Sequence, residues 1–244
     1  MALALGLILP ASASAATFVV NSNADTSDGM CDAANCTLRE AIVAANGNGA
    51  SDTITFDLDA GAREILLNAT VLTISNDMAD PDLTIDGDLD GDGTPDITVD
   101  AQGGSRVFLI ASGAEATLEG LVITGGAFSG GGILNDGGTL TVTNSTFSGN
   151  SAGYGGGIRN DNGTLIVTNS TFSGNYGSSG GIHNNAGTLT VTDSTFSGNT
   201  GYGYGGGIVS AGPTTVTNTT FSANNASYGG GIANDYGGTL TVTN

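Results

Sequence analysis

The chain has 244 residues, of which 42 are glycine and none is tryptophan, so it can form one sizeable core made of small and branched side chains. Its formal net charge is −19, because 23 acidic residues are opposed by only four basic ones, all of them arginine. This charge argues against nucleic acid as a partner and favours calcium or basic partners.

Residues 1–15 contain the apolar region and the cleavage region of a secretory signal peptide. Ala13-Ser14-Ala15 is a small-x-small cleavage site, although the basic region that normally comes first is missing. The apolar run from Ala2 to Leu9 is far shorter than the roughly 20 residues that span a bilayer. The sequence therefore predicts an exported protein, extracellular or at the cell surface, with no transmembrane segment.

Two cysteines lie in residues 16–50, the segment predicted to form an N-terminal cap. Cys31 and Cys36 would close a small loop as a disulfide in an oxidising compartment. A metal-binding pair is the alternative, but the only histidine, His183, leaves a zinc site incomplete.

A short helix is predicted directly after these cysteines. Thr37 followed by Glu40 forms a capping box, and Asn46-Gly47 ends the helix. Its apolar face consists of Leu38, Ala41, Ile42 and Ala45. Such a helix would cover the unpaired edges at the start of a strand stack, with a binding site as the alternative role. Arg39 is expected to bind a carboxylate or backbone carbonyls for structural reasons.

Residues 51–125 contain less regular strands, and among them an aspartate-rich loop, "DLDGDGTPD", at 88–96. Its spacing matches the first part of an EF-hand loop. The expected Ca²⁺ ligands are Asp88, Asp90, Asp92, Asp96 and the carbonyl oxygen of Thr94. The twelfth position is Val99 in place of glutamate, so Asp86 or Asp100 would have to substitute. A structural calcium site is the interpretation, with a plain acidic turn and a catalytic metal site as alternatives.

Residues 126–244 repeat one unit. The F-S-x-N stretches begin at positions 147, 172, 196 and 221, and the Gly-Gly-Ile triplets end at positions 133, 158, 182, 208 and 232. Within each unit, "TLTVTN" or a close variant alternates threonine with apolar residues, which is the period of a strand. A unit of this size cannot bury its own apolar face and must stack on its neighbours. The sequence therefore predicts an all-β solenoid of parallel strands.

One unit per turn would place equivalent residues in ladders about 4.8 Å apart. The inward residues of one coil are Ile133, Leu140, Val142 and Phe147, with Ile158, Leu165, Val167 and Phe172 above them. The expected ladders are Phe147, Phe172, Phe196 and Phe221; Asn135, Asn160, Asn184 and Asn234; and Asn144, Asn169 and Asn218, with Asp193 between the last two. The glycine pair before each isoleucine is expected to adopt positive φ. None of these residues needs a catalytic role.

Two resemblances follow from these motifs. "GGGI" with "FSGN" is similar to the GG-x-I and F-x-x-N repeats of chlamydial-type polymorphic outer membrane proteins, which are right-handed parallel β-helices displayed at the cell surface. Residues 25–42, "DTSDGMCDAANCTLREAI", resemble the CSLREA domain that precedes β-helices in exported bacterial proteins, with Thr37 in place of serine. The resemblances imply a right-handed parallel β-helix with an N-terminal capping helix.

Two functions are compatible with this architecture. The first is an exported scaffold, displayed or secreted, that adheres to glycans, host proteins or the cell envelope. The alternative is a polysaccharide lyase or glycosidase, because such enzymes share the fold. The candidate catalytic cluster is Arg159, Asp161, His183 and Asp136. Nearly constant repeat lengths provide no inserted loop to wall a cleft, so a solvated charged face is expected there. Arg63 or Arg106 would have to serve any lyase site in the irregular coils.

The last unit stops at "GGTLTVTN", where earlier units continue with "STFSGN" or a variant of it. We expect the final strands, around Ile232 and Leu240, to present an unpaired edge, as in a fragment truncated inside a coil.

Overall fold

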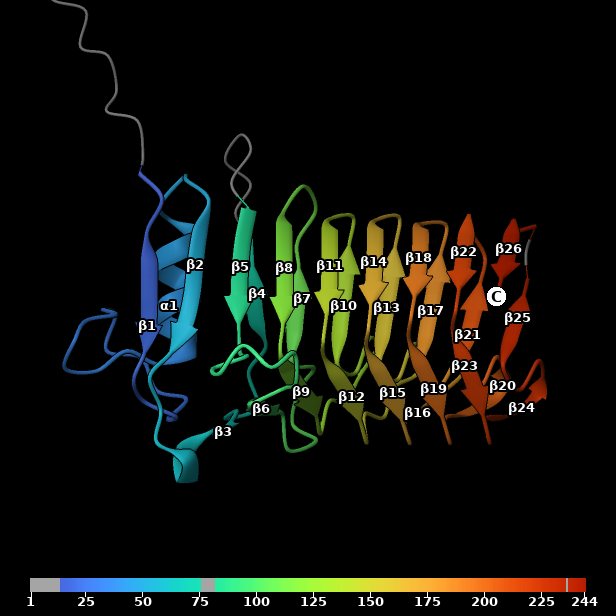
Figure 1. The fold of residues 1–244 in the computed structure, drawn as a ribbon, viewed down its shortest axis with the longest axis horizontal. Helices are drawn as coiled ribbons and strands as arrows, with labels where there is room; N and C mark the ends of the chain where they lie inside the picture. The colour runs from blue at the N-terminus through green and yellow to red at the C-terminus, as the bar shows by residue number, and fades with distance from the viewer. Residues whose placement is uncertain (1–13, 76–81, 236) are drawn as a thin grey trace, which may run out of the picture.

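The structure is a computed structural model that describes residues 14–75, 82–235 and 237–244. The predicted signal peptide lies almost entirely outside these residues. In the described part, every pairing between named strands is parallel, and successive coils stack along one long axis (Figure 1). This arrangement confirms the predicted parallel β-solenoid.

Two long sheets run along the stack. Sheet 1 contains β1 (Thr17–Val20), β2 (Asp52–Phe56), β5 (Asp82–Asp86), β8 (Glu115–Glu119), β11 (Thr139–Thr143), β14 (Thr164–Thr168), β18 (Thr188–Thr192), β22 (Thr214–Thr217) and β26 (Leu240–Thr243). Sheet 2 contains β4 (Leu72–Ile74), β7 (Phe108–Ile110), β10 (Ile133–Asp136), β13 (Ile158–Asp161), β17 (Ile182–Asn185), β21 (Ile208–Ser210) and β25 (Ile232–Asn234).

Two further sheets contribute to the coils, the first as long as sheet 2 and the second present in three of the described coils. Sheet 3 contains β3 (Glu64–Leu66), β6 (Ile97–Asp100), β9 (Leu121–Thr124), β12 (Thr146–Ser148), β15 (Thr171–Ser173), β19 (Thr195–Ser197) and β23 (Thr220–Ser222). Sheet 4 is short and contains β16 (Tyr176–Gly177), β20 (Thr200–Tyr204) and β24 (Asn225–Tyr228). A 3₁₀ turn, η1 (Ala60–Ala62), precedes β3.

The register between coils is the predicted one. β10 pairs with β13 so that Ile133 faces Ile158, and β12 pairs with β15 so that Phe147 faces Phe172. These side chains are fully buried, whereas alternate residues on the same strands are partly exposed. The irregular coils obey the same pairing from β2 to β9, so the core is continuous from the cap into the repeats. β25 and β26 each pair with one strand only, at the C-terminal end of the stack.

The glycine pair before each isoleucine has a different role from the predicted one. Positive φ occurs at the residue before the pair in four of the five repeats, for example at Gly155 (φ 61°) and Gly205 (φ 52°). The pair itself needs space: a Cβ on Gly157 would lie 2.8 Å from the carbonyl oxygen of Gly181 and 2.8 Å from the ring of Phe172. Adjacent coils approach each other so closely here that only glycine fits between them.

The predicted helix is present as α1 (Leu38–Asn46), with Thr37 as its N-cap. It lies at the N-terminal end of the stack beside β1 and β2 (Figure 1) and also contacts β4. Its apolar residues are buried as predicted: Leu38, Ala41, Ile42 and Ala45. None of the described helices is long and apolar enough to cross a membrane.

Candidate functional site

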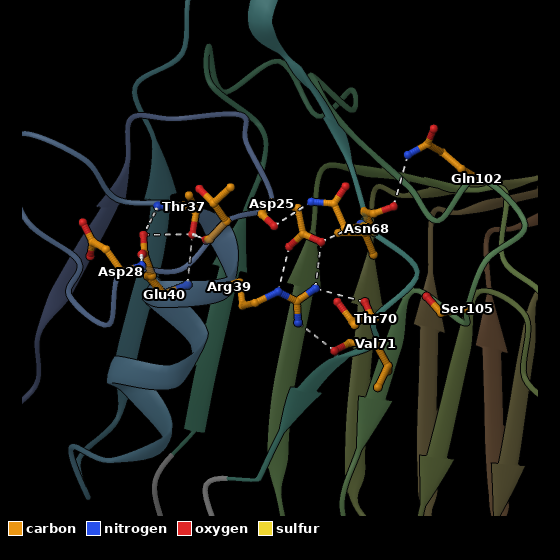
Figure 2. Close-up of polar contacts among 12 residues, drawn as sticks. Asp25, Asp28, Thr37, Arg39, Glu40, Asn68, Thr70, Val71, Gln102 and Ser105 are labelled. Carbon is orange, nitrogen blue, oxygen red and sulfur yellow. Dashed lines mark hydrogen bonds and ion pairs between the residues drawn. The ribbon is translucent and has the colours of Figure 1, made fainter.

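The capping box at the start of α1 is fully formed (Figure 2). The Thr37 hydroxyl oxygen accepts a hydrogen bond from the Glu40 N–H at 3.3 Å, and the Glu40 carboxylate accepts from the N–H groups of Thr37 at 2.9 Å and Asp28 at 2.6 Å. Burial alone would raise the pKa of the Glu40 carboxyl, but these backbone donors hold the pKa below its usual value. The helix start therefore depends on a charged, enclosed carboxylate.

Arg39 joins α1 to the coil that contains β4. Its guanidinium donates to both carboxylate oxygens of Asp25, at 2.7 and 3.0 Å, and to the carbonyl oxygens of Val71 at 2.9 Å and Thr70 at 3.0 Å (Figure 2). The Asp25 carboxylate also accepts from the N–H of Asn68 at 2.7 Å. Arg39 thus binds both a carboxylate and backbone carbonyls, and this cluster attaches the cap to the first coils.

The two cysteines lie in the loop before α1 and are joined as a disulfide. Cys36 is fully buried, and its N–H donates to Oδ1 of Asn21 at 2.7 Å, next to β1. This hydrogen bond ties the loop to the end of the first strand. Because the two sulfur atoms are joined to each other, the structure favours the disulfide over the metal-binding alternative.

The aspartate-rich loop brings together three of the predicted ligands. Carboxylate oxygens of Asp88, Asp90 and Asp96 all lie within 4.8 Å of one another. Asp92 does not join them: its carboxylate accepts from the hydroxyl and N–H of Thr94, and these hydrogen bonds lower its pKa. The structure therefore groups three of the four aspartates, and a ligand role for Asp92 stays a prediction.

Neighbouring groups occupy part of this acidic cluster. Asp96 forms an ion pair with Arg63 at 2.5 Å. The two proposed substitutes for the missing glutamate are not part of this group of three: Asp86 accepts from the N–H of Asp88, and Asp100 accepts from the N–H of Gln102. Their role as calcium ligands stays a prediction.

The predicted catalytic cluster is brought together on the outer face of sheet 2. Arg159 forms an ion pair with Asp161 at 2.8 Å and donates to the hydroxyl of Ser129 at 2.6 Å. Its guanidinium lies 5.4 Å from the ring centroid of Tyr154, and Asp161 also accepts from the side chain of Asn185 at 3.1 Å. Most of the donors and acceptors of this cluster are therefore used within it.

His183 lies one coil beyond Arg159, as the register predicts. Its Nδ1 is 3.2 Å from the hydroxyl of Ser179, and its ring meets that of Tyr154 edge-on, with centroids 5.3 Å apart. Burial, aided by the charge of Arg159, lowers the pKa of His183 to about 4, so the ring is neutral near pH 7. The fourth predicted residue, Asp136, lies one coil before Asp161 and is exposed.

We expect a His183→Gln substitution to flatten the acid limb of the stability curve. The unfolded chain binds a proton at the ordinary histidine pKa of 6.5, whereas the folded chain resists protonation until about pH 4. The contribution of His183 to the free energy of unfolding is therefore fully present above pH 6.5. It is lost as the pH falls toward 4, and the loss is on the order of 3 kcal/mol. Urea unfolding at a series of pH values measures this loss. If the free energy of unfolding fell equally steeply with pH in the variant and in the unchanged chain, the prediction would be contradicted.

A ladder inside the core, which we did not predict, joins the asparagines that end each F-S-x-N stretch. Its members are Asn150, Asn175, Asn199 and Asn224. The side-chain nitrogens of the first three donate to Oδ1 in the next coil at 2.9 to 3.0 Å and to a backbone carbonyl oxygen of the preceding coil, and that of Asn224 donates to the carbonyl oxygen of Phe196. The signal was in the sequence, since this asparagine closes the same motif as the phenylalanine ladder.

The predicted ladders are present only in part. Asn135, Asn160 and Asn184 are linked side chain to side chain at 2.7 and 2.8 Å, but Ser210 takes the next place and separates them from Asn234. The series at the other corner has left-handed φ, yet its side-chain bonds run only from Asn169 to Asn144 and on to Glu119. In the described structure, neither Asp193 nor Asn218 extends that series.

The four phenylalanines stack as parallel rings inside the coils. Phe147, Phe172 and Phe196 have centroids 4.6 Å apart, and Phe221 follows at 5.1 Å. These distances match the strand spacing, so the stack is a direct consequence of the repeat.

Five exposed tyrosines lie along the segments between sheets 3 and 2, which include the strands of sheet 4. We call this set the tyrosine strip: Tyr154, Tyr176, Tyr202, Tyr204 and Tyr228. Tyr204 and Tyr228 stack with centroids 5.3 Å apart, and Tyr176 and Tyr202 lie 5.7 Å apart. The strip could have been found in the sequence, because every tyrosine up to Tyr228 falls between an F-S-x-N stretch and the next glycine cluster.

Comparison with known proteins addresses the fold. The family model described as right-handed beta helix region matches residues 96–221, which is 126 of the 244 residues. A search of the curated proteins and a search of the solved structures each returned no match. The matched segment runs from the end of the aspartate-rich loop through the phenylalanine ladder. The chain therefore belongs to the right-handed β-helix family.

Proposed function

We propose that this chain is an exported scaffold that adheres to glycans, host proteins or the cell envelope through the tyrosine strip. The carrying observation is that four phenylalanines stack inside the coils, whereas five tyrosines are left 42 to 65% exposed along the segments between sheets 3 and 2. Tyrosine combines an apolar ring with a hydrogen-bonding hydroxyl and is enriched at interfaces. The rigid coils hold these rings at fixed spacing, which favours a repeated contact over a single deep site.

Two sequence features support export and display. Residues 25–42 resemble the CSLREA domain of exported bacterial proteins, and the repeats resemble those of polymorphic outer membrane proteins. The disulfide between Cys31 and Cys36 suits an oxidising compartment.

Beads coated with the full chain test the adhesive role. We expect them to attach to bacterial envelopes or to an epithelial cell layer more than albumin-coated beads do. A chain with Tyr204→Ser and Tyr228→Ser should lose most of this attachment, while a matched chain with Thr190→Ser and Thr215→Ser on sheet 1 should keep it. Attachment that is no greater than that of albumin, or that is unaffected by the tyrosine changes, would overturn the proposal.

A structural Ca²⁺ in the aspartate-rich loop is a second part of the proposal. We expect calcium to bind chelator-treated protein with measurable heat and to raise its melting temperature, because three carboxylates within 4.8 Å repel one another until a cation neutralises them. Asp90→Ala should abolish both effects, whereas Asp161→Ala on sheet 2 should abolish neither. If Ca²⁺ produced no heat of binding and did not change the melting curve, the calcium site would be ruled out and the loop would be a plain acidic turn.

The alternative function, a polysaccharide lyase or glycosidase, has less support. A lyase needs an available base beside its carboxylates, and the Arg159 guanidinium already binds Asp161 and Ser129. We expect the chain with Ca²⁺ to turn over polygalacturonate no faster than a variant with Arg63→Ala, Arg106→Ala and Arg159→Ala. Absorbance of unsaturated products measures this, and faster turnover by the unchanged chain would favour the enzyme.

A further inference from the structure

A concave site lies on the sheet 2 side of the irregular coils. It is a cavity of about 640 Å³, open to solvent, between the segment before β4, the segment before β7 with Leu109 of that strand, and the loop from β9 to β10. Its wall is mainly apolar, from Val71, Leu109 and Phe128, and one charged side chain, Arg106, lines it. The volume falls in the range of small-molecule sites, roughly 300 to 1,000 Å³.

Arg106 differs from the other three arginines of the chain. Each of those has a carboxylate partner: Arg39 pairs with Asp25, Arg63 with Asp96 and Arg159 with Asp161. The guanidinium of Arg106 makes no hydrogen bond or ion pair with any described residue, although it is partly buried. Burial and repulsion from Arg159 both lower its pKa, and the charge of Asp136 offsets this only in part. A bound anion would relieve both effects.

Phe128 is the second unusual residue of this cavity. Its φ is 66°, in the left-handed region that a bulky side chain rarely adopts, and it is 65% exposed to solvent. The backbone at Phe128 is strained, and its exposed ring buries too little surface to offset that strain in the stability of the fold. Strained residues cluster at ligand sites, and Phe128 lines the same cavity as the unpaired guanidinium of Arg106.

We propose that this cavity binds a small organic acid, with its carboxylate on Arg106 and its apolar body against Phe128, Leu109 and Val71. A carboxylate accepts two parallel hydrogen bonds from a guanidinium, which supplies the missing partner. The apolar wall selects an aliphatic or aromatic body, because the hydroxyl groups of an acidic sugar would lose their hydrogen bonds to water there. A chain of charge −19 repels polyanions and tolerates a single negative charge more readily. The inference does not depend on the adhesive role.

A pair of probes that differ only in charge tests the site. N-Acetylphenylalanine and its neutral amide are titrated into the full chain at low salt, with binding followed by calorimetry. We expect the acid to bind at least about tenfold more tightly than the amide, since a charged hydrogen-bonded pair is lost in the amide. Arg106→Gln should remove this difference, and Arg63→Gln, which changes an arginine outside the cavity, should preserve it.

Phe128→Gly separates a ligand contact from a structural one. Glycine adopts the same φ without strain, so this variant should melt at a higher temperature and yet bind the acid more weakly. Equal affinity for acid and amide, or unchanged affinity in both Arg106→Gln and Phe128→Gly, would overturn the proposal. Tenfold tighter binding of trigalacturonate, or of a pentapeptide ending in phenylalanine, would also overturn it by assigning the cavity to a polysaccharide or to a protein terminus.

Discussion

Replacement of Asn175 by alanine is expected to lower the free energy of unfolding by about 4 kcal/mol, as measured by urea denaturation. The Asn175 side chain is fully enclosed and makes four hydrogen bonds. Its nitrogen donates to Oδ1 of Asn199 and to the carbonyl oxygen of Phe147, and its Oδ1 accepts from the backbone N–H and the side chain of Asn150. Alanine would remove all four bonds and leave the backbone N–H of Asn150 without its acceptor, which costs about 1 to 3 kcal/mol before the coils relax. The Asn150 side chain keeps its bond to the Ile123 carbonyl oxygen, and Asn199 Oδ1 keeps its bond from the N–H at position 175, so the other lost bonds and the cavity add smaller amounts.

Asn169→Gly is the matched control on the outside of the coils. Asn169 also belongs to an asparagine series, but it is exposed and its side chain donates one hydrogen bond, to Asn144. Glycine tolerates the φ of 48° at this position, so the loss should stay below about 1 kcal/mol. Equal losses in the two variants would show that the interior ladder contributes no more than a surface hydrogen bond.

The coil, its register and its apolar interior could be predicted because the repeat states the same pattern several times. Ile133, Phe147 and their equivalents recur at nearly constant spacing, and a period of two assigns each residue to the inside or the outside. The capping helix was predictable for a local reason, since the capping box needs only Thr37 and Glu40.

The interior asparagines were missed because an amide in a core is costly when a single coil is considered. Asn150 becomes favourable only when Asn175 lies directly above it, 25 residues later in the sequence. The opposite error concerns Asp193, which has the right position in its series but no amide hydrogen to donate.

The charged clusters were only partly predictable because their partners come from irregular segments. Arg159 finds Ser129 across 30 residues, and Asp96 finds Arg63 across 33. Neither pair has a fixed spacing that a motif could reveal. The same holds for the cavity at Arg106, whose wall is assembled from three separate loops.

The second large effect is expected where coils approach most closely. In Gly157→Ala the added methyl group would lie 2.8 Å from the Gly181 carbonyl oxygen and 2.8 Å from the Phe172 ring. Backbone cannot rotate away as a side chain can, so the coils must separate and Phe172 must leave its stack on Phe147. We expect the free energy of unfolding to fall by about 3 kcal/mol, measured by urea denaturation, with faster hydrogen exchange at the amide of Gly157, which bonds to that carbonyl.

Gly153→Ala, in the same coil, isolates the steric cause. A Cβ at Gly153 meets no atom within 4 Å, and its φ lies outside the left-handed region, so alanine fits without strain. Because alanine also restricts the unfolded chain, this variant should be as stable as the parent or more stable by about 0.5 kcal/mol. If Gly157→Ala were equally stable, the glycine pairs would not be needed for the close approach of adjacent coils. The glycine pair in every repeat would then need an explanation other than packing between coils.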